Sequence, residues 1–131
     1  MGNGEFKDGQ RYTGSSAFME TIKELVNGRS YLASHFMLAE ECGELTQAVS
    51  KMVRHIDETK DDRRNKKDNA FKYIELADHI LEESADVIIC ICTLLEIYGF
   101  SADDMDVAIT RKMVRNLARI GGDARSAGAK T

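Results

Sequence analysis

The chain has 131 residues, a formal net charge of −4 and 43% apolar residues, which is the size and composition of one domain with a small core. It contains no proline, so nothing forbids long helices, whose interiors proline breaks. The negative charge disfavours a protein that clamps a nucleic-acid backbone with a basic surplus, and the longest apolar stretch, 87–95, is too short to span a bilayer.

The chain begins with a polar segment and two predicted helices. Residues 1–14 contain four glycines, which predicts a flexible arm. Apolar residues at steps of three and four predict a first helix over 17–26, and Gly28 suits the left-handed conformation that ends helices. Ser30 can cap a second helix over 31–58, because its hydroxyl can accept a hydrogen bond from a free N–H group of the first turn.

A charged loop separates the second helix from the third. Residues 59–68 lack apolar side chains and predict a solvated loop before a helix over 69–98, which Gly99 ends. We expect residues 87–95 to be the most buried segment, because they are nearly all apolar. A buried strand is the rejected alternative there, since helical periodicity continues on both sides.

The last predicted helix follows Ser101, which can cap it. Asp103 and Asp104 lie in its first turn, where the helix dipole favours anions. Gly121 and Gly122 are expected to stop this helix and to leave residues 121–131 as a disordered tail.

The predicted fold is therefore all-α: a four-helix, antiparallel, bundle-like domain over 15–120. Helices this long often bury their remaining apolar face against a second copy, so we expect a homo-oligomer. The positions expected to line the core are 38, 42, 45, 49, 52, 53 and 56 of the second helix and 105, 109, 113, 117 and 120 of the fourth.

Two acidic pairs lie on the second and third helices. Glu41 and Glu44 are three residues apart, as are Glu83 and Asp86, which is about 60° around a helix and about 4.5 Å along it. Glu41 and Glu83 fall at the margins of the apolar faces, where unpaired carboxylates repel and lose hydration. A hard cation with oxygen ligands removes both penalties. A solvated acidic face is the alternative that the residues leave open.

The types of side chain favour Mg²⁺, with Mn²⁺ as a second choice. The candidate ligands are all carboxylates, and the Glu-x-x-His motif of di-iron bundles is missing. His79, one turn before Glu83, is either an outer partner of this site or a solvated side chain. His35 and His55 are interpreted as structural or surface residues.

The cysteines do not suggest a metal site or a disulfide. Their number is odd, and no Cys-x-x-Cys motif is present. They lie in apolar helical patterns and are interpreted as reduced core residues of a cytoplasmic protein: Cys42, Cys90 and Cys92.

The fourth helix carries a basic face near its end. Lys112, Asn116 and Arg119 follow one another at steps of four and three, so they share one side of the helix. Opposite a carboxylate-held Mg²⁺, these groups suit a polyphosphate. The alternative is that cations simply favour the C-terminal end of a helix.

In their order, these motifs resemble a known family. Glu-Glu-x-x-Glu at 40–44, Glu-x-x-Asp at 83–86 and Lys-x-x-x-Asn-x-x-Arg at 112–119 are similar to those of the MazG-like nucleoside triphosphate pyrophosphohydrolases. This all-α superfamily includes dimeric dUTPases and dCTP pyrophosphatases. The resemblance spans about residues 17–120.

The resemblance implies hydrolysis of a nucleoside triphosphate between its α and β phosphates, in a nucleotide-pool housecleaning role. It implies that Glu40, or an acid near it, orients or deprotonates the attacking water. Lys112 and Asn116 are expected to contact the phosphates, with Arg119 a weaker candidate. Compact members form dimers or tetramers, so the same is expected here. The metal ligands implied by similarity are Glu41, Glu44, Glu83 and Asp86.

Some assignments stay open. Further acids on the third helix can join the metal site: Glu75, Asp78 and Glu82. Three aromatic residues are candidates for stacking on the base, with core packing as the alternative: Phe18, Tyr31 and Phe36. The competing function is a non-catalytic helical module that binds a nucleotide or regulates. A metal-storage or redox bundle is disfavoured by the missing Glu-x-x-His.

Overall fold

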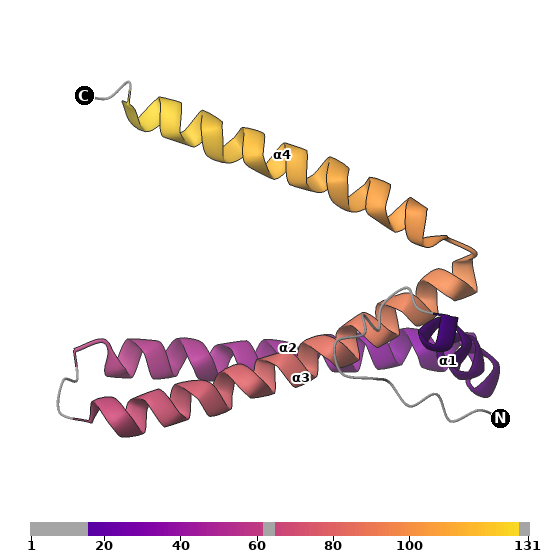
Figure 1. Cartoon of the computed structure of the whole chain (residues 1–131), viewed down its shortest axis with the longest axis horizontal. Helices are drawn as coiled ribbons and strands as arrows, with labels where there is room; N and C mark the ends of the chain where they lie inside the picture. Colours follow the sequence, from indigo (N-terminus) through magenta and orange to yellow (C-terminus); the bar gives the residue numbers. More distant parts are fainter. Residues whose placement is uncertain (1–15, 62–64, 129–131) are drawn as a thin grey trace. The chain divides into compact units, whose positions relative to one another are not determined.

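A computed structural model describes residues 16–61 and 65–128, except the side chains of residues 124, 126 and 127. No strand occurs in these ranges, so the all-α prediction is confirmed. The chain divides after Tyr98 into two compact units. The first unit holds three helices and the second holds one (Figure 1): α1 (Ser16–Gly28), α2 (Tyr31–Thr59), α3 (Lys66–Tyr98) and α4 (Ala102–Gly128).

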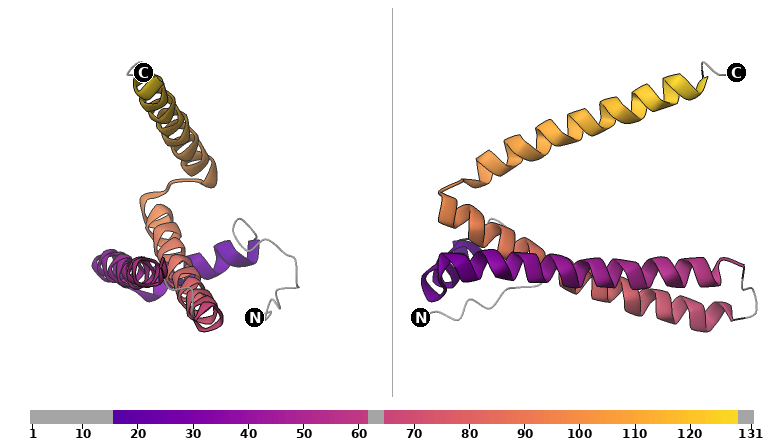
Figure 2. Two further views of the ribbon diagram at one scale, coloured as in Figure 1. Left: turned by 90° about the vertical axis from the view of Figure 1, so that its left-hand side faces the viewer. Right: turned by 180° about the vertical axis from the view of Figure 1, so that it is seen from behind.

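In the first unit, α2 and α3 lie side by side as an antiparallel pair, and α1 packs on α3 (Figure 2). Ala48 of α2 is completely buried, and its small side chain allows the two helices to approach closely. The other buried apolar side chains are few: Ile22 of α1, Met52 of α2, and Leu76 and Cys90 of α3. The core is therefore a thin seam along the helix pair.

The predicted caps are present. The hydroxyl of Ser30 accepts a hydrogen bond from the backbone N–H of Ala33 at 3.0 Å. At the start of α4, Ser101 and Asp104 form a reciprocal capping box, in which each backbone N–H donates to the other's side chain. Gly99 ends α3 in the left-handed conformation, with φ of 74°. These local signals were sufficient to locate the starts of α2 and α4 and the break between the units.

The first helix ends at Gly28 as predicted, but two expectations about glycines at helix ends are wrong. Gly28 closes α1 without a positive φ, and the extended backbone of Ser30 (φ −69°, ψ 154°) provides the turn instead. Gly121 and Gly122 do not stop α4, which continues to Gly128. Glycine in a helix costs only about 1 kcal/mol relative to alanine, so neighbouring helix-forming residues can carry the helix through it.

The charged loop is shorter than expected, because α3 begins at Lys66 rather than at residue 69. The predicted arm over 1–14 lies outside the described residues, as does the end of the tail, 129–131.

Most of the predicted core face of α2 is exposed in the first unit. Of its seven positions only Met52 is buried, whereas Val49, Val53 and Ile56 are exposed by 43%, 58% and 50%. Contact with one neighbouring helix buries only a narrow stripe of a helix. The apolar face of α2 is wider than this stripe, so part of it stays exposed. In α3, residues 87–95 are buried or half-buried except Ile88, as their composition predicts.

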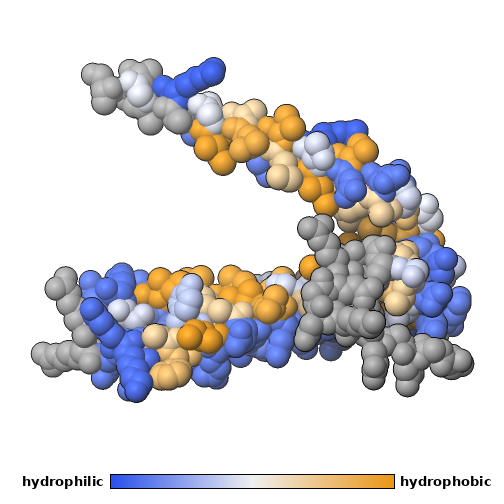
Figure 3. Space-filling view, viewed as in Figure 1, coloured by the Kyte–Doolittle hydropathy of each residue, from blue (hydrophilic) through white to orange (hydrophobic). Residues whose placement is uncertain are grey.

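The second unit also carries an apolar line along its helix. Ile109, Met113, Leu117 and Ile120 of α4, predicted for a core, are exposed. Figure 3 shows apolar side chains at the surface of both units. The helical period was therefore identified correctly, but the contacts within each unit leave these apolar side chains exposed.

None of the helices in the described ranges is by itself long and apolar enough to cross a membrane. The segments Lys66–Tyr98 and Ala102–Asp123 meet that length and composition test only when they are taken together.

Candidate metal centre

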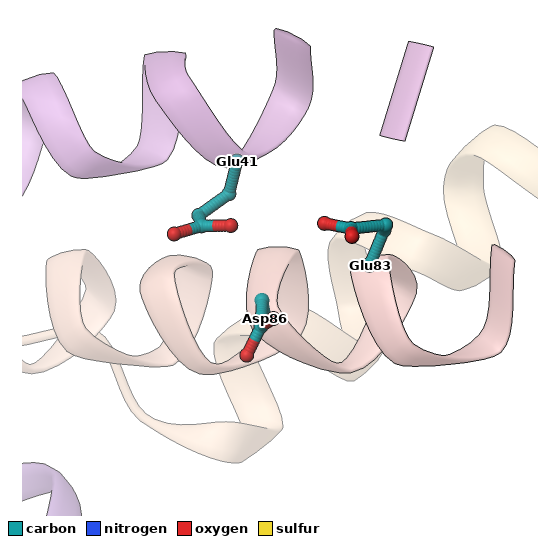
Figure 4. Close-up of side chains that lie close together, drawn as sticks. All are labelled: Glu41, Glu83 and Asp86. Carbon is teal, nitrogen blue, oxygen red and sulfur yellow. The ribbon is translucent and has the colours of Figure 1, made fainter. Parts of the chain in front are cut away.

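Three acidic side chains from facing helices meet in the first unit. Carboxylate oxygens of Glu41 on α2 and of Glu83 and Asp86 on α3 all lie within 4.8 Å of one another. Glu83 and Asp86 share one side of α3 because three residues complete most of a helical turn. Figure 4 shows Glu41 extending toward them across the space between the helices. Three of the four predicted metal ligands are thus brought together.

Glu83 is the most buried member of this group, with 9% of the residue exposed. Its Oε1 atom lies 3.4 Å from Nδ1 of His79. Its Oε2 atom is buried, and no described residue forms a hydrogen bond with it. A buried carboxylate oxygen without a partner has lost its hydration without compensation. A ligand that binds this oxygen is the simplest physical explanation for it.

Repulsion within the group is visible at Glu41. Partial burial raises the pKa of Glu41 above its ordinary value, and the negative charges of Glu44, Asp86, Glu40 and Glu83 raise this pKa further. Each of these effects disfavours the ionised carboxylate. A cation bound among the carboxylates would reverse the balance, because its charge favours their ionised form.

Glu44, the fourth predicted ligand, does not belong to the group of close oxygens. It lies about 60° around α2 from Glu41, and its side chain is exposed, as is that of Glu40. Both are near enough for their charges to act on Glu41. Glu44 therefore stays a predicted ligand, and the role of Glu40 toward water stays a prediction.

The donor set fits a hard divalent cation. All three members offer carboxylate oxygens, which Mg²⁺ and Mn²⁺ prefer, and the group contains neither histidine nor cysteine among the residues described. The buried oxygen Oε2 of Glu83 has no hydrogen-bond partner among the described residues. A cation bound to this oxygen would compensate for its lost hydration. Glu41, Glu83 and Asp86 are thus suitable ligands for Mg²⁺ or Mn²⁺.

The three further acids of α3 that were candidate ligands do not join the group in this structure. Glu75 pairs instead with Lys72 at 3.3 Å on the exposed surface. The other two, Asp78 and Glu82, are exposed. Because exposed carboxylates keep their hydration, no bound cation is needed to compensate for its loss.

Two histidines connect the helices of the first unit. Nε2 of His55 on α2 lies 3.0 Å from the backbone carbonyl oxygen of Asn69 on α3. The ring of His35 contacts the Tyr98 hydroxyl and packs edge-to-face on the Tyr98 ring, with centroids 5.6 Å apart. Both are structural contacts, in agreement with the interpretation from the sequence.

The candidate base-stacking residues differ in exposure. Tyr31 and Phe36 are exposed by 62% and 65%, so neither packs in the core of the first unit, whereas Phe18 is half-buried. Their role in stacking stays a prediction.

The basic face belongs to the second unit. Lys112, Asn116 and Arg119 are exposed on α4, at positions that share one side of the helix. Their contact with phosphates stays a prediction.

Cys90 is a neighbour of the acidic group that the sequence interpretation assigned only to the core. Burial raises the pKa of the Cys90 thiol, and the charges of Glu41 and Asp86 raise this pKa further, so the thiol is within reach of their charges. Cys90 is four residues after Asp86 and therefore one helical turn away on the same side of α3. That spacing was the signal available in the sequence.

The chain was compared with known protein families and proteins. The model of the MazG nucleotide pyrophosphohydrolase domain matches residues 29–117, which is more than half of the chain. No curated protein and no solved structure matches significantly. The matched range includes all the acids of the group.

Proposed function

Because the chain belongs to the MazG nucleotide pyrophosphohydrolase family, we propose that it hydrolyses a nucleoside triphosphate to a nucleoside monophosphate and pyrophosphate. The observation that carries the proposal is the meeting of Glu41, Glu83 and Asp86 from two helices. The buried, unpartnered oxygen of Glu83 adds to it. Such an arrangement destabilises a fold unless the acids serve a ligand.

Glu41, Glu83 and Asp86 would hold Mg²⁺, or Mn²⁺ in its place, with Glu44 completing the set from the next turn of α2. When bound, the cation would neutralise phosphate charge and align a water molecule with the bond to be broken. Family membership and the all-oxygen donor set support this assignment.

Other groups would position the reactants. Glu40 has an exposed carboxylate beside Glu41 and would orient the attacking water or accept its proton. Lys112 and Asn116 would bind phosphate oxygens, with Arg119 as a further cation. No covalent nucleophile is required, because catalysis of phosphoryl transfer consists mainly of positioning and charge stabilisation.

The active form would be a homodimer or homotetramer. Large apolar side chains are exposed in the first unit, including Val53 and Ile56 of α2 and Phe71 and Ile74 of α3. Exposed apolar surface of this kind marks association sites. The proposal places the enzyme in the cytoplasm, which is supported by three free cysteine thiols.

The direct test is incubation of the purified protein with Mg²⁺ and a panel of nucleoside triphosphates, with pyrophosphate and orthophosphate assayed separately. We expect release of pyrophosphate together with the monophosphate. Release of orthophosphate would indicate a phosphatase instead. Binding of nucleotide without either product would favour the non-catalytic module.

Two variants make this test specific. Asp86→Asn should lose turnover while keeping the helical circular dichroism spectrum, because its carboxylate is exposed and not required for packing. Glu58→Gln, the same kind of change on an exposed position of α2, is the control and should retain wild-type activity.

A further inference from the structure

A histidine outside the acidic group contacts its most buried member. His79 precedes Glu83 by one turn of α3, and its Nδ1 atom lies 3.4 Å from Glu83 Oε1. The side chain of His79 is 40% exposed, whereas that of Glu83 is 12% exposed. His79 is therefore more open to solvent than the carboxylate that it contacts.

The two oxygens of Glu83 have different surroundings. Oε1 faces the imidazole, whereas Oε2 is buried and has no hydrogen-bond partner among the described residues. Figure 4 shows the carboxylate of Glu83 directed into the space that it shares with Glu41 and Asp86. Oε1 thus contacts the imidazole, and Oε2 is free to bind a cation held by the three carboxylates.

Among the described basic side chains, only that of His79 lies within ion-pair distance of this carboxylate. The other members of the group are carboxylates, which repel Glu83 and cannot donate a hydrogen bond to it when ionised. Without the histidine, repulsion would favour rotation of Glu83 away from Glu41 and Asp86. A neutral imidazole with its proton on Nδ1 is sufficient to oppose this rotation.

We propose that His79 is a positioning residue, which holds Oε1 of Glu83 so that Oε2 is directed at the divalent cation. This inference rests on the proposed function, because it assumes that the acidic group binds the ion. Ligand side chains in metal sites are commonly held by an outer partner of this kind, and loss of such a partner weakens metal binding by about 10- to 100-fold.

The test compares two substitutions of similar size. His79→Leu removes the donor. His79→Asn keeps a side-chain amide, whose N–H₂ group can occupy the place of Nδ1. Binding of Mn²⁺ without nucleotide is measured by electron paramagnetic resonance of the free ion. His79→Leu should weaken binding by about tenfold, and His79→Asn should restore it to near the wild-type value.

Two further readouts separate positioning from a general structural role. The melting temperature in EDTA should be the same for wild type and His79→Leu. In the hydrolysis assay, His79→Leu should raise the Mg²⁺ concentration needed for half-maximal rate, while kcat and the nucleotide KM at saturating Mg²⁺ stay close to wild type. His79→Ala replaces His79→Leu if the leucine variant does not fold.

The outcomes distinguish the inference from the proposed function. If Glu83→Gln loses Mn²⁺ binding but His79→Leu binds as tightly as wild type, the positioning role is overturned while the metal site stands. If His79→Asn is as impaired as His79→Leu, a polar donor at the place of Nδ1 is not the cause, which also overturns the inference. If the wild-type protein binds no Mn²⁺, the proposed metal site itself is wrong.

Discussion

The acid pair of α3 and the acid pair of α2 have the same spacing but different surroundings. Both members of the α3 pair, Glu83 and Asp86, join the group of close carboxylates, whereas of the α2 pair only Glu41 does. Spacing by three residues places two carboxylates on one side of a helix. Whether both reach across to a neighbour depends on how the helix is rotated about its axis.

The comparison suggests a division of roles between the helices. α3 presents a buried carboxylate with one oxygen 3.4 Å from His79, and burial leaves this side chain little freedom to move. α2 presents Glu41 at the margin and Glu44 in solvent, so part of its contribution depends on side-chain movement. Removal of a rigid, buried ligand should therefore be more damaging than removal of a mobile one.

The largest effect is expected from Glu83→Gln. A ligand that stabilises transition-state charge by several kcal/mol corresponds to a loss in kcat/KM of about 1000-fold. Pyrophosphate release at saturating Mg²⁺ measures this loss, with Glu58→Gln as the control. In EDTA the variant should melt no lower than wild type, because a repelling charge has been removed. Activity within a few-fold of wild type would contradict the assignment of the buried ligand.

A smaller effect is expected from Glu44→Gln. If Glu44 reaches the ion only by moving from solvent, its contribution is roughly 1.4 kcal/mol, or about tenfold in kcat/KM. The same pyrophosphate assay gives the value. A loss as large as that of Glu83→Gln would mean that the two helices contribute equally, and no loss would remove Glu44 from the ligand set.

The pH dependence of stability tests the repulsion at Glu41. Because the pKa of Glu41 is raised in the metal-free protein, the folded state binds more protons than the unfolded state. The free energy of unfolding therefore falls as pH rises from the ordinary glutamate pKa through the raised value. Glu41→Gln removes this cost, so in EDTA the variant should be the more stable protein at pH 7.

Urea denaturation across pH checks this expectation. The advantage of Glu41→Gln should disappear below about pH 4, where the wild-type carboxyl is protonated in both states. With saturating Mg²⁺ at pH 7 the order should reverse, because only the wild type gains the full binding energy of the ion. An advantage that does not vary with pH would show that repulsion is not its cause.

The smallest effect on activity is expected from Ser30→Ala, at the start of α2. Loss of the cap should lower stability by about 1 kcal/mol, measured by urea denaturation, because the N–H of Ala33 loses its acceptor. Turnover at 25 °C should stay near the wild-type value, since the acids lie further along the helix. A large loss of turnover would mean that general destabilisation explains the effects of the acid variants as well.

Local signals predicted much of the fold. The absence of proline and the helical spacing of apolar residues indicated four helices, and Ser30, Ser101 and Gly99 marked their boundaries through hydrogen bonds and backbone conformation within a few residues. Gly28 misled because glycine permits a left-handed conformation without requiring it. Val53 and Leu117 are exposed, because the covering of a helical face depends on contacts distant in the sequence, which no local pattern contains.

The candidate site was predictable to the same degree. Helical spacing identified Glu41, Glu83 and Asp86 as candidate ligands, because the angle of each residue around its helix follows from its sequence position. The separation of Glu44 from that group depends on the rotation of α2 against α3, which is a property of the packed pair. The unpaired oxygen of Glu83 likewise appears only when the helices are assembled.

The most direct test of the account is a crystal structure of the protein grown with Mn²⁺, with the anomalous signal used to locate the ion. We predict a peak between α2 and α3 that is coordinated by Glu41, Glu83 and Asp86, with Glu83 binding through Oε2. A peak at another place, or these three side chains turned apart with no ion between them, would contradict the account.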